Sequence, residues 1–117
     1  MSNAVVDSGV FIASVYVETL SPQAKGLFQQ LQRAQITLHA PTLLRYELLA
    51  VARKAVYQNR VTGQDGRAAR DPMLNYPVTL HFDDALLKRG YEIAEEFNRP
   101  TTYDSQYLAL AERLACV

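Results

Sequence analysis

Cysteine is almost absent from this sequence, in which Cys116 is the only thiol among 117 residues. A single cysteine excludes an internal disulfide framework and is typical of proteins that stay in a reducing compartment. Histidine occurs only twice, and no group of Cys and His has the spacing of a zinc site. A disulfide scaffold and a zinc-stabilised domain are therefore both excluded.

Long apolar runs are missing as well. No stretch approaches the roughly 18 apolar residues that a membrane-spanning helix needs. The N-terminus has neither the basic start nor the uninterrupted apolar segment of a signal peptide. Hydrophobic residues make up 49% and charged residues 21% of the chain, which is an ordinary globular composition. The sequence therefore predicts one compact cytoplasmic domain over residues 1–117, with no membrane contact.

Net charge is also lacking, because 12 basic residues balance 12 acidic ones. This balance argues against a protein that coats nucleic acid non-specifically, but it leaves room for an enzyme that touches a few phosphates. The charges are unevenly distributed: residues 45–70 have a local excess of +4, and residues 71–117 one of −4. Two interpretations stay open, namely two solvated helix faces or a basic flank for a polyanion beside an acidic surface.

Short β-rich runs alternate with helical patterns along the chain. Strands are predicted at residues 3–6, 36–39 and 78–81, and helices at residues 8–18, 21–34, 41–60, 83–97 and 101–115. Thr42 and Asp83 are the predicted N-caps of two of these helices. Residues 62–77 contain two Gly and two Pro, so we expect a loop there with at most a short helix. The alternation predicts an α/β fold, a three-layer parallel sheet flanked by helices.

A carboxylate interrupts the first apolar run, "AVVDSGVF", at Asp7. In parallel α/β sheets, ligands collect beyond the carboxyl ends of the strands. Asp7 falls at that end of the first predicted strand. We therefore expect it on the rim of the sheet, where the strand stops and a helix starts, rather than inside the core.

Two further acids lie in apolar company. Glu47 borders the stripe of Leu44 and Leu48 on the long helix, and Asp104 shares a predicted inward face with Leu108 on the last helix. Each acid has an ordinary alternative. A carboxylate can cap a helix, stabilise its first turn or pair with a neighbouring Arg. A capping acid, however, has no need to face the apolar side.

Carboxylates that face inward together repel each other unless a cation or a proton compensates. Carboxylate oxygens are hard ligands and suit Mg²⁺ or Mn²⁺. A carboxylate-held ion of this kind usually works on phosphates, because it polarises a phosphoryl oxygen and activates a water. Asp7, Glu47 and Asp104 are thus candidate catalytic and metal-ligating residues.

Three segments of the sequence resemble the PIN-domain ribonucleases, and in particular the VapC-like toxins of prokaryotic toxin–antitoxin pairs. The segments are "VVDSGVFIA", "APTLLRYELLAVARKA" and "RPTTYDSQYLALAERL". The resemblance implies a metal-dependent endoribonuclease that cleaves RNA, pairs with a small antitoxin protein and forms homodimers. By position, Asp7, Glu47 and Asp104 match the family's first three acids. Ser8 matches a small hydroxyl residue that commonly follows the first acid.

The resemblance departs from the family pattern at the end of the sequence. The family continues into another strand and a fourth acid, whereas this sequence ends at Val117. We therefore expect a sheet that lacks its last strand or strands, with an apolar strand edge at residues 4–6 that promotes association. The missing fourth acid keeps an alternative open: a non-catalytic PIN-like module that binds RNA or a protein partner.

Several other residues are weighed as site candidates. Arg45 and Arg53 are proposed as phosphate contacts. A haloacid dehalogenase-type phosphatase is disfavoured, because that family needs a second Asp where this chain has Gly9. His39 and His81 end two predicted strands, and each is interpreted as a half-buried residue with a hydrogen bond rather than as a general base.

Asp83 and the adjacent Asp84 are explained by capping and the helix dipole. Tyr46, Tyr103 and Tyr107 are large enough to stack on RNA bases. The helical spacing of Tyr103 and Tyr107 favours packing instead.

Overall fold

The computed structural model describes residues 3–7, 26 and 29–115 of the chain. The elements are β1 (Asn3–Val5), β2 (Thr37–Pro41), α3 (Leu43–Tyr57), α4 (Gly63–Leu74), β3 (Thr79–His81), α5 (Asp84–Glu96) and α6 (Tyr103–Leu114). The helix predicted at residues 8–18 lies outside the described residues. Residues 29–33, at the end of the next predicted helix, are helical.

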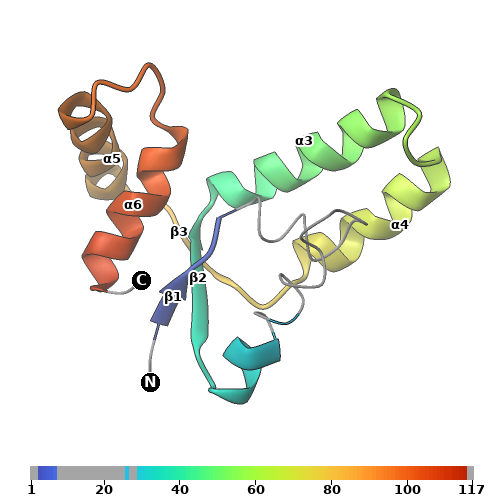
Figure 1. The fold of residues 1–117 in the computed structure, drawn as a ribbon, viewed down its shortest axis with the longest axis horizontal. Coiled ribbons are helices and arrows are strands. Elements are labelled where there is room, and N and C mark those ends of the chain that lie inside the picture. Colours follow the sequence, from blue (N-terminus) through green and yellow to red (C-terminus); the bar gives the residue numbers. More distant parts are fainter. Residues whose placement is uncertain (1–2, 8–25, 27–28, 116–117) are drawn as a thin grey trace.

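The three strands form one parallel sheet in the order β1-β2-β3, as the alternation of strands and helices predicted. Val5 pairs with His39, and His39 pairs in turn with Thr79. Figure 1 shows the sheet between two helical pairs, α3 with α4 on one side and α5 with α6 on the other. The predicted layering of helices on both faces of a parallel sheet is confirmed. Within the described part of the chain, β1 is an edge strand.

Side chains of the strands alternate between two cores. Val6, Leu38 and Ala40 belong to the larger cluster, which also contains residues of α3 and α4. Val5 packs in addition against the smaller cluster formed by α5 and α6. Successive residues of a strand point to opposite faces. A sheet that is covered by helices on both faces therefore needs apolar residues at both the even and the odd positions of its strands. None of the described helices is long and apolar enough to cross a membrane.

The segment at residues 62–77 was wrongly predicted as a loop, because Gly63–Leu74 form the twelve-residue helix α4. The side chain of Thr62 caps this helix by accepting a hydrogen bond from the Asp65 amide at 3.0 Å. Gly66 allows α4 to approach α3, since a Cβ there would overlap with Val56 Cγ2. Pro72 falls in the last turn, where it removes one hydrogen bond to the carbonyl four residues earlier, near the end of the helix.

Thr42 stands at the N-cap position of α3, but its side chain makes no capping hydrogen bond, contrary to the prediction. Its hydroxyl donates instead to the carbonyl oxygen of His81 at 3.3 Å, and its amide donates to the same oxygen at 3.1 Å. Thr42 therefore ties the start of α3 to the end of β3. Asp83, in contrast, caps α5 as predicted and accepts from the Leu86 amide at 2.8 Å.

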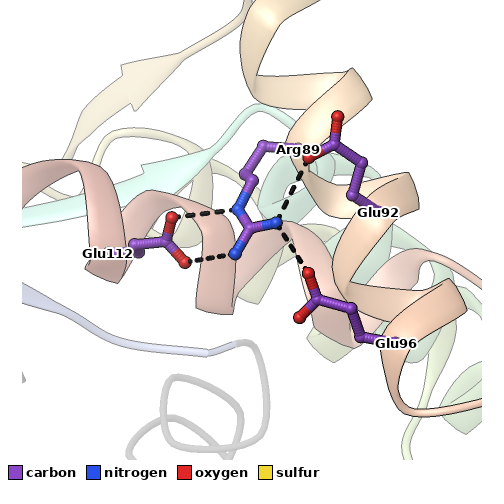
Figure 2. Close-up of polar contacts among 4 residues, drawn as sticks. All are labelled: Arg89, Glu92, Glu96 and Glu112. Carbon is purple, nitrogen blue, oxygen red and sulfur yellow. Dashed lines mark hydrogen bonds and ion pairs between the residues drawn. The ribbon is translucent and has the colours of Figure 1, made fainter.

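Charged side chains link α5 to α6. The guanidinium of Arg89 on α5 donates two hydrogen bonds to Glu112 on α6, at 2.9 and 3.0 Å. It also bonds to Glu92 and Glu96 on its own helix, as Figure 2 shows. Arg113 on α6 makes a second link, with two bonds to the carboxylate of Asp83 at 2.6 and 2.9 Å.

Candidate active site

Glu47 is held by a tyrosine from another helix. It lies half-buried on α3, between the buried Leu44 and Leu48. The hydroxyl of Tyr107 on α6 donates to Glu47 Oε1 at 2.5 Å. The Tyr107 ring is only 7% exposed and belongs to the larger core cluster. Packing of the ring therefore fixes the hydroxyl, and the hydroxyl orients the carboxylate.

Asp7 is exposed and is the second residue after β1, at the carboxyl-end rim of the sheet where it was predicted. The residue before it, Val6, is 7% exposed and packs in the larger core cluster. The amide of Val6 donates to the carbonyl oxygen of His39 at 3.4 Å, which extends the pairing of β1 with β2 to the residue before the acid. Ser8 lies outside the described residues.

Asp104 lies in the first turn of α6, but the prediction that it faces inward is wrong. Both Asp104 and Leu108 are exposed, and Leu108 is exposed to 56%. The buried residues of α6 are Ser105, Gln106, Tyr107, Ala109 and Leu110. These buried residues form the face of α6 that packs against α5 and the sheet. Asp104 lies outside this face and lines a cavity of about 330 Å³, together with Ile93 and Phe97 from the end of α5.

The larger core brings together the three segments that carry the acids. Val6 precedes Asp7, Leu48 follows Glu47, and Tyr107 stands one helical turn after Asp104; these three neighbours share one cluster. The acids supply only carboxylate oxygens, which suit a hard divalent cation. Among the described residues, however, no three Asp, Glu, His or Cys side chains converge into a group that could hold an ion. Binding of a shared ion would have to draw the three carboxylates together.

Arg45 and Arg53 are exposed on α3 and are turned away from Glu47. At 3.6 residues per turn, they stand about 160° and about 120° around the helix from it. The guanidinium of Arg53 lies over the ring of Tyr57, 5.9 Å from its centre. The structure therefore does not bring these two cations to the carboxylate of Glu47.

The interpretation of His39 as a structural residue is supported by its contacts. His39 is 9% exposed, and its ring nitrogens lie 2.9 Å from Asn3 Oδ1 and 2.9 Å from His81 Nε2. Because Asn3 Oδ1 can only accept, His39 Nε2 donates to it, and His81 Nε2–H then donates to His39 Nδ1. Burial, and then the proximity of His81, lower the pKa of His39 below its usual value. The two rings are therefore hydrogen-bonding partners that, together with Asn3, join the three strands.

Sequence reasoning missed the role of the Tyr107 hydroxyl. The helical spacing of Tyr103 and Tyr107 indicated packing, which is right for the Tyr107 ring, whereas Tyr103 is 58% exposed. The partner, Glu47, is 60 residues away in the sequence. The only available signal was that a buried tyrosine usually finds a hydrogen-bond partner.

The family model described as PIN domain matches residues 4–117 of the chain. Curated relatives include a VapC ribonuclease of Mycobacterium bovis and ribonuclease VapC9 of Mycobacterium tuberculosis. Each is 33% identical over 79 residues, which is 68% of this chain and 60% of the relative. A crystal structure of Mycobacterium tuberculosis VapC20, described as a sarcin–ricin loop cleaving toxin, has a similar fold. Its TM-score is 0.68 at 15% identity, over 98% of this chain and 85% of that one.

Proposed function

This chain belongs to the PIN-domain family, and on that premise we propose that it is a metal-dependent endoribonuclease, the VapC-like toxin of a toxin–antitoxin pair. The ribonuclease names of the two mycobacterial relatives support the reaction class. The observation that carries the proposal is the shared core of Val6, Leu48 and Tyr107, which gathers the three acid-bearing segments. The proposed location is the cytoplasm.

The proposed ligands of a divalent ion, Mg²⁺ or Mn²⁺, are Asp7, Glu47 and Asp104. A bound ion of this kind supplies Lewis-acid polarisation of a phosphoryl oxygen and a more acidic water. The chain's own contribution is orientation. Tyr107 holds one oxygen of Glu47 in place, and the first turn of α6 sets Asp104 beside that tyrosine on the same helix.

Contacts to the RNA backbone are proposed for three further residues. Ser8 follows the first acid and offers a hydroxyl. Arg45 and Arg53 are exposed cations on α3, the helix that carries Glu47. Since both point away from Glu47, they suit phosphates that lie outside the cleavage position.

A homodimer and a cognate antitoxin are the proposed protein partners. Support for the homodimer comes from exposed apolar side chains around an opening of about 380 Å³ at the carboxyl ends of β2 and β3. Tyr46 is 70% exposed, Phe82 76% and Leu87 43%. Exposed aromatic patches of this kind mark interaction sites, and a two-fold dimer buries the same patch on both copies. Phe82→Ser should then convert a dimer into a folded monomer in light scattering, and the melting temperature should lose its dependence on protein concentration.

A second candidate function is a non-catalytic PIN-like module that binds RNA or a protein. The observation in its favour is that the described acids do not converge into a metal-binding group. This module would bind its partner without Mn²⁺ and leave RNA intact.

The deciding experiment is cleavage of a structured RNA with Mn²⁺ and with EDTA. We expect cleavage that EDTA abolishes and that Asp7→Asn removes, while Glu95→Gln, which changes an exposed acid on α5, cleaves like the parent. Calorimetric titration with Mn²⁺ gives a readout that is independent of activity. Equal Mn²⁺ binding by the parent and by Asp104→Asn would contradict the ligand assignment. An intact RNA would favour the non-catalytic module.

A further inference from the structure

A groove of about 480 Å³ runs between α3 and α4. Its floor is apolar and includes Leu49, Ala52 and Val56 of α3. The close contact of Gly66 with Val56 keeps the two helices at a short separation, because any side chain larger than hydrogen would push them apart. The packing of the helical pair thus defines the groove.

Three arginines surround this floor: Arg53 from α3, and Arg67 and Arg70 from α4. All three are exposed, and none of the described residues that line the groove is acidic. Arg70 forms an ion pair with the neighbouring Asp71 at 3.2 Å, with both side chains at least half exposed. Such an exposed pair is weak and can exchange for another anion.

The groove is separate from the candidate active site. On α3, the floor residues stand about 140° to 180° around the helix axis from Glu47, so the two features occupy opposite sides of the helix. A ligand in the groove would therefore leave Glu47 and Tyr107 untouched. The groove can act as a second contact for a long substrate, but not as the place of cleavage.

We propose that this groove binds single-stranded RNA, with phosphates at the three arginines and bases against the apolar floor. The inference rests on the proposed ribonuclease function and adds a remote contact to the same RNA. Arginine guanidinium groups match phosphate geometry and also stack on bases. The local charge excess of +4 over residues 45–70 also suits a polyanionic ligand. A second copy of the chain would place like charges opposite each other.

Fluorescence anisotropy with a labelled single-stranded RNA of about 16 nucleotides tests the groove. The parent is compared with a triple variant, Arg53→Gln, Arg67→Gln and Arg70→Gln, in EDTA, so that no cleavage is needed. A control variant removes exposed positive charges elsewhere, Arg33→Gln and Lys88→Gln, and keeps Arg99 because it lines the cavity of Asp104. All five residues of the two variants are exposed, and melting temperatures check that both variants fold.

The slope of log K against log salt is negative. The loss of three phosphate contacts from a single strand should reduce the magnitude of this slope by about two. At about 0.1 M salt this corresponds to a roughly hundredfold weaker Kd for the groove variant. The control variant should keep most of the parent's slope. Equal slopes for the groove and control variants, or parental binding by the groove variant, would overturn the proposal. If the groove variant binds RNA like the parent, an acidic protein segment remains as the candidate ligand of the groove.

An error in the groove assignment and an error in the proposed nuclease function give different experimental results. If the parent cleaves RNA and the groove variant binds it normally, only the groove assignment is wrong. If the parent cleaves nothing but the groove variant loses binding in EDTA, the groove assignment holds and the nuclease is wrong. In an active protein, the groove variant should raise KM for a long RNA and leave kcat unchanged, because it removes binding common to ground and transition states.

Discussion

The α3–α4 pair and the α5–α6 pair each consist of two packed helices, but they use their charges differently. In α5–α6, Arg89 is shared among Glu92, Glu96 and Glu112 (Figure 2). Arg113 pairs with Asp83. In α3–α4, neither Arg53 nor Arg67 has an ion pair within the described part of the chain, and the helices meet through Gly66 and Val56.

The difference shows where each pair can interact with a ligand. Charges that neutralise one another across α5 and α6 hold the helices together and are already satisfied. Charges along α3 and α4 stay available to an external polyanion. Helix packing in α3–α4 therefore has to depend on apolar contact, and in α5–α6 it depends on apolar contact and charge together.

The largest effect is expected from Gly66→Ala, which breaks the apolar contact of α3 with α4. The new Cβ would overlap with the stiff, β-branched Val56, and overpacking of this kind costs about 1–3 kcal/mol in the free energy of unfolding. Gly63→Ala on the same helix is the control. Its Cβ meets only the guanidinium of Arg67 at 3.4 Å, so we expect a gain of about 0.5 kcal/mol. Urea unfolding of both variants measures the difference, and equal stabilities would show that the helices separate freely.

Tyr107→Phe should lower the free energy of unfolding by about 1–2 kcal/mol, because it removes the hydrogen bond that joins α6 to Glu47 on α3. The ring and its packing are kept. Tyr103→Phe, at a tyrosine that is 58% exposed on the same helix, should change stability by less than about 0.5 kcal/mol. If the two variants unfold at the same urea concentration, the bond to Glu47 contributes nothing to stability.

The sheet between the two helical pairs should weaken in mild acid through His39. Burial and His81 lower the pKa of His39 in the folded chain, so the unfolded chain binds the proton more readily. The associated stability is present above the unfolded pKa of about 6.5 and is lost as the pH falls below that value. Unfolding of the parent and of His39→Asn is compared between pH 7 and pH 5. A steeper loss for the variant than for the parent would contradict the assignment.

The smallest effect is expected at the surface link of α5 with α6. The two bonds from Arg113, and then the Leu86 amide, hold the pKa of Asp83 well below its usual range. A lowered carboxylate pKa stabilises the fold above the unfolded value of about 3.9, and the gain fades as the pH falls further. Asp83→Asn keeps a capping oxygen but loses the charge, so its Tm should lie slightly below the parent's at pH 7 and approach it at pH 3. High salt should also reduce the gap.

Most of the secondary structure could be predicted from local patterns. The apolar strands, the Asp83 cap and the position of Asp7 at a strand end each depend on a few neighbouring residues. The helix α4 could not, because Gly63, Gly66 and Pro72 are typical of loops. Only the tertiary contact with Val56 explains why a glycine is favourable within that helix.

The candidate site, too, could be predicted only in part from the sequence. The apolar surroundings of Glu47 followed from the periodicity of α3, and its half-buried position agrees. The orientation of Asp104 did not follow, because both sides of α6 carry apolar residues and the sheet and α5 select which side is buried. Whether Asp7, Glu47 and Asp104 share an ion stays a prediction for the Mn²⁺ titration.

The parallel sheet also constrains the order of events during synthesis. The side-chain bonds of His39 reach partners 36 and 42 residues away in the sequence, and each strand pairing spans a comparable loop. Chains are made at about 5–20 residues per second, so β1 emerges from the ribosome seconds before β2 can pair with it. Throughout that interval its apolar residues have no partner strand. Val5 also packs against the α5–α6 cluster, so the contacts of β1 are complete only after those two helices have been made.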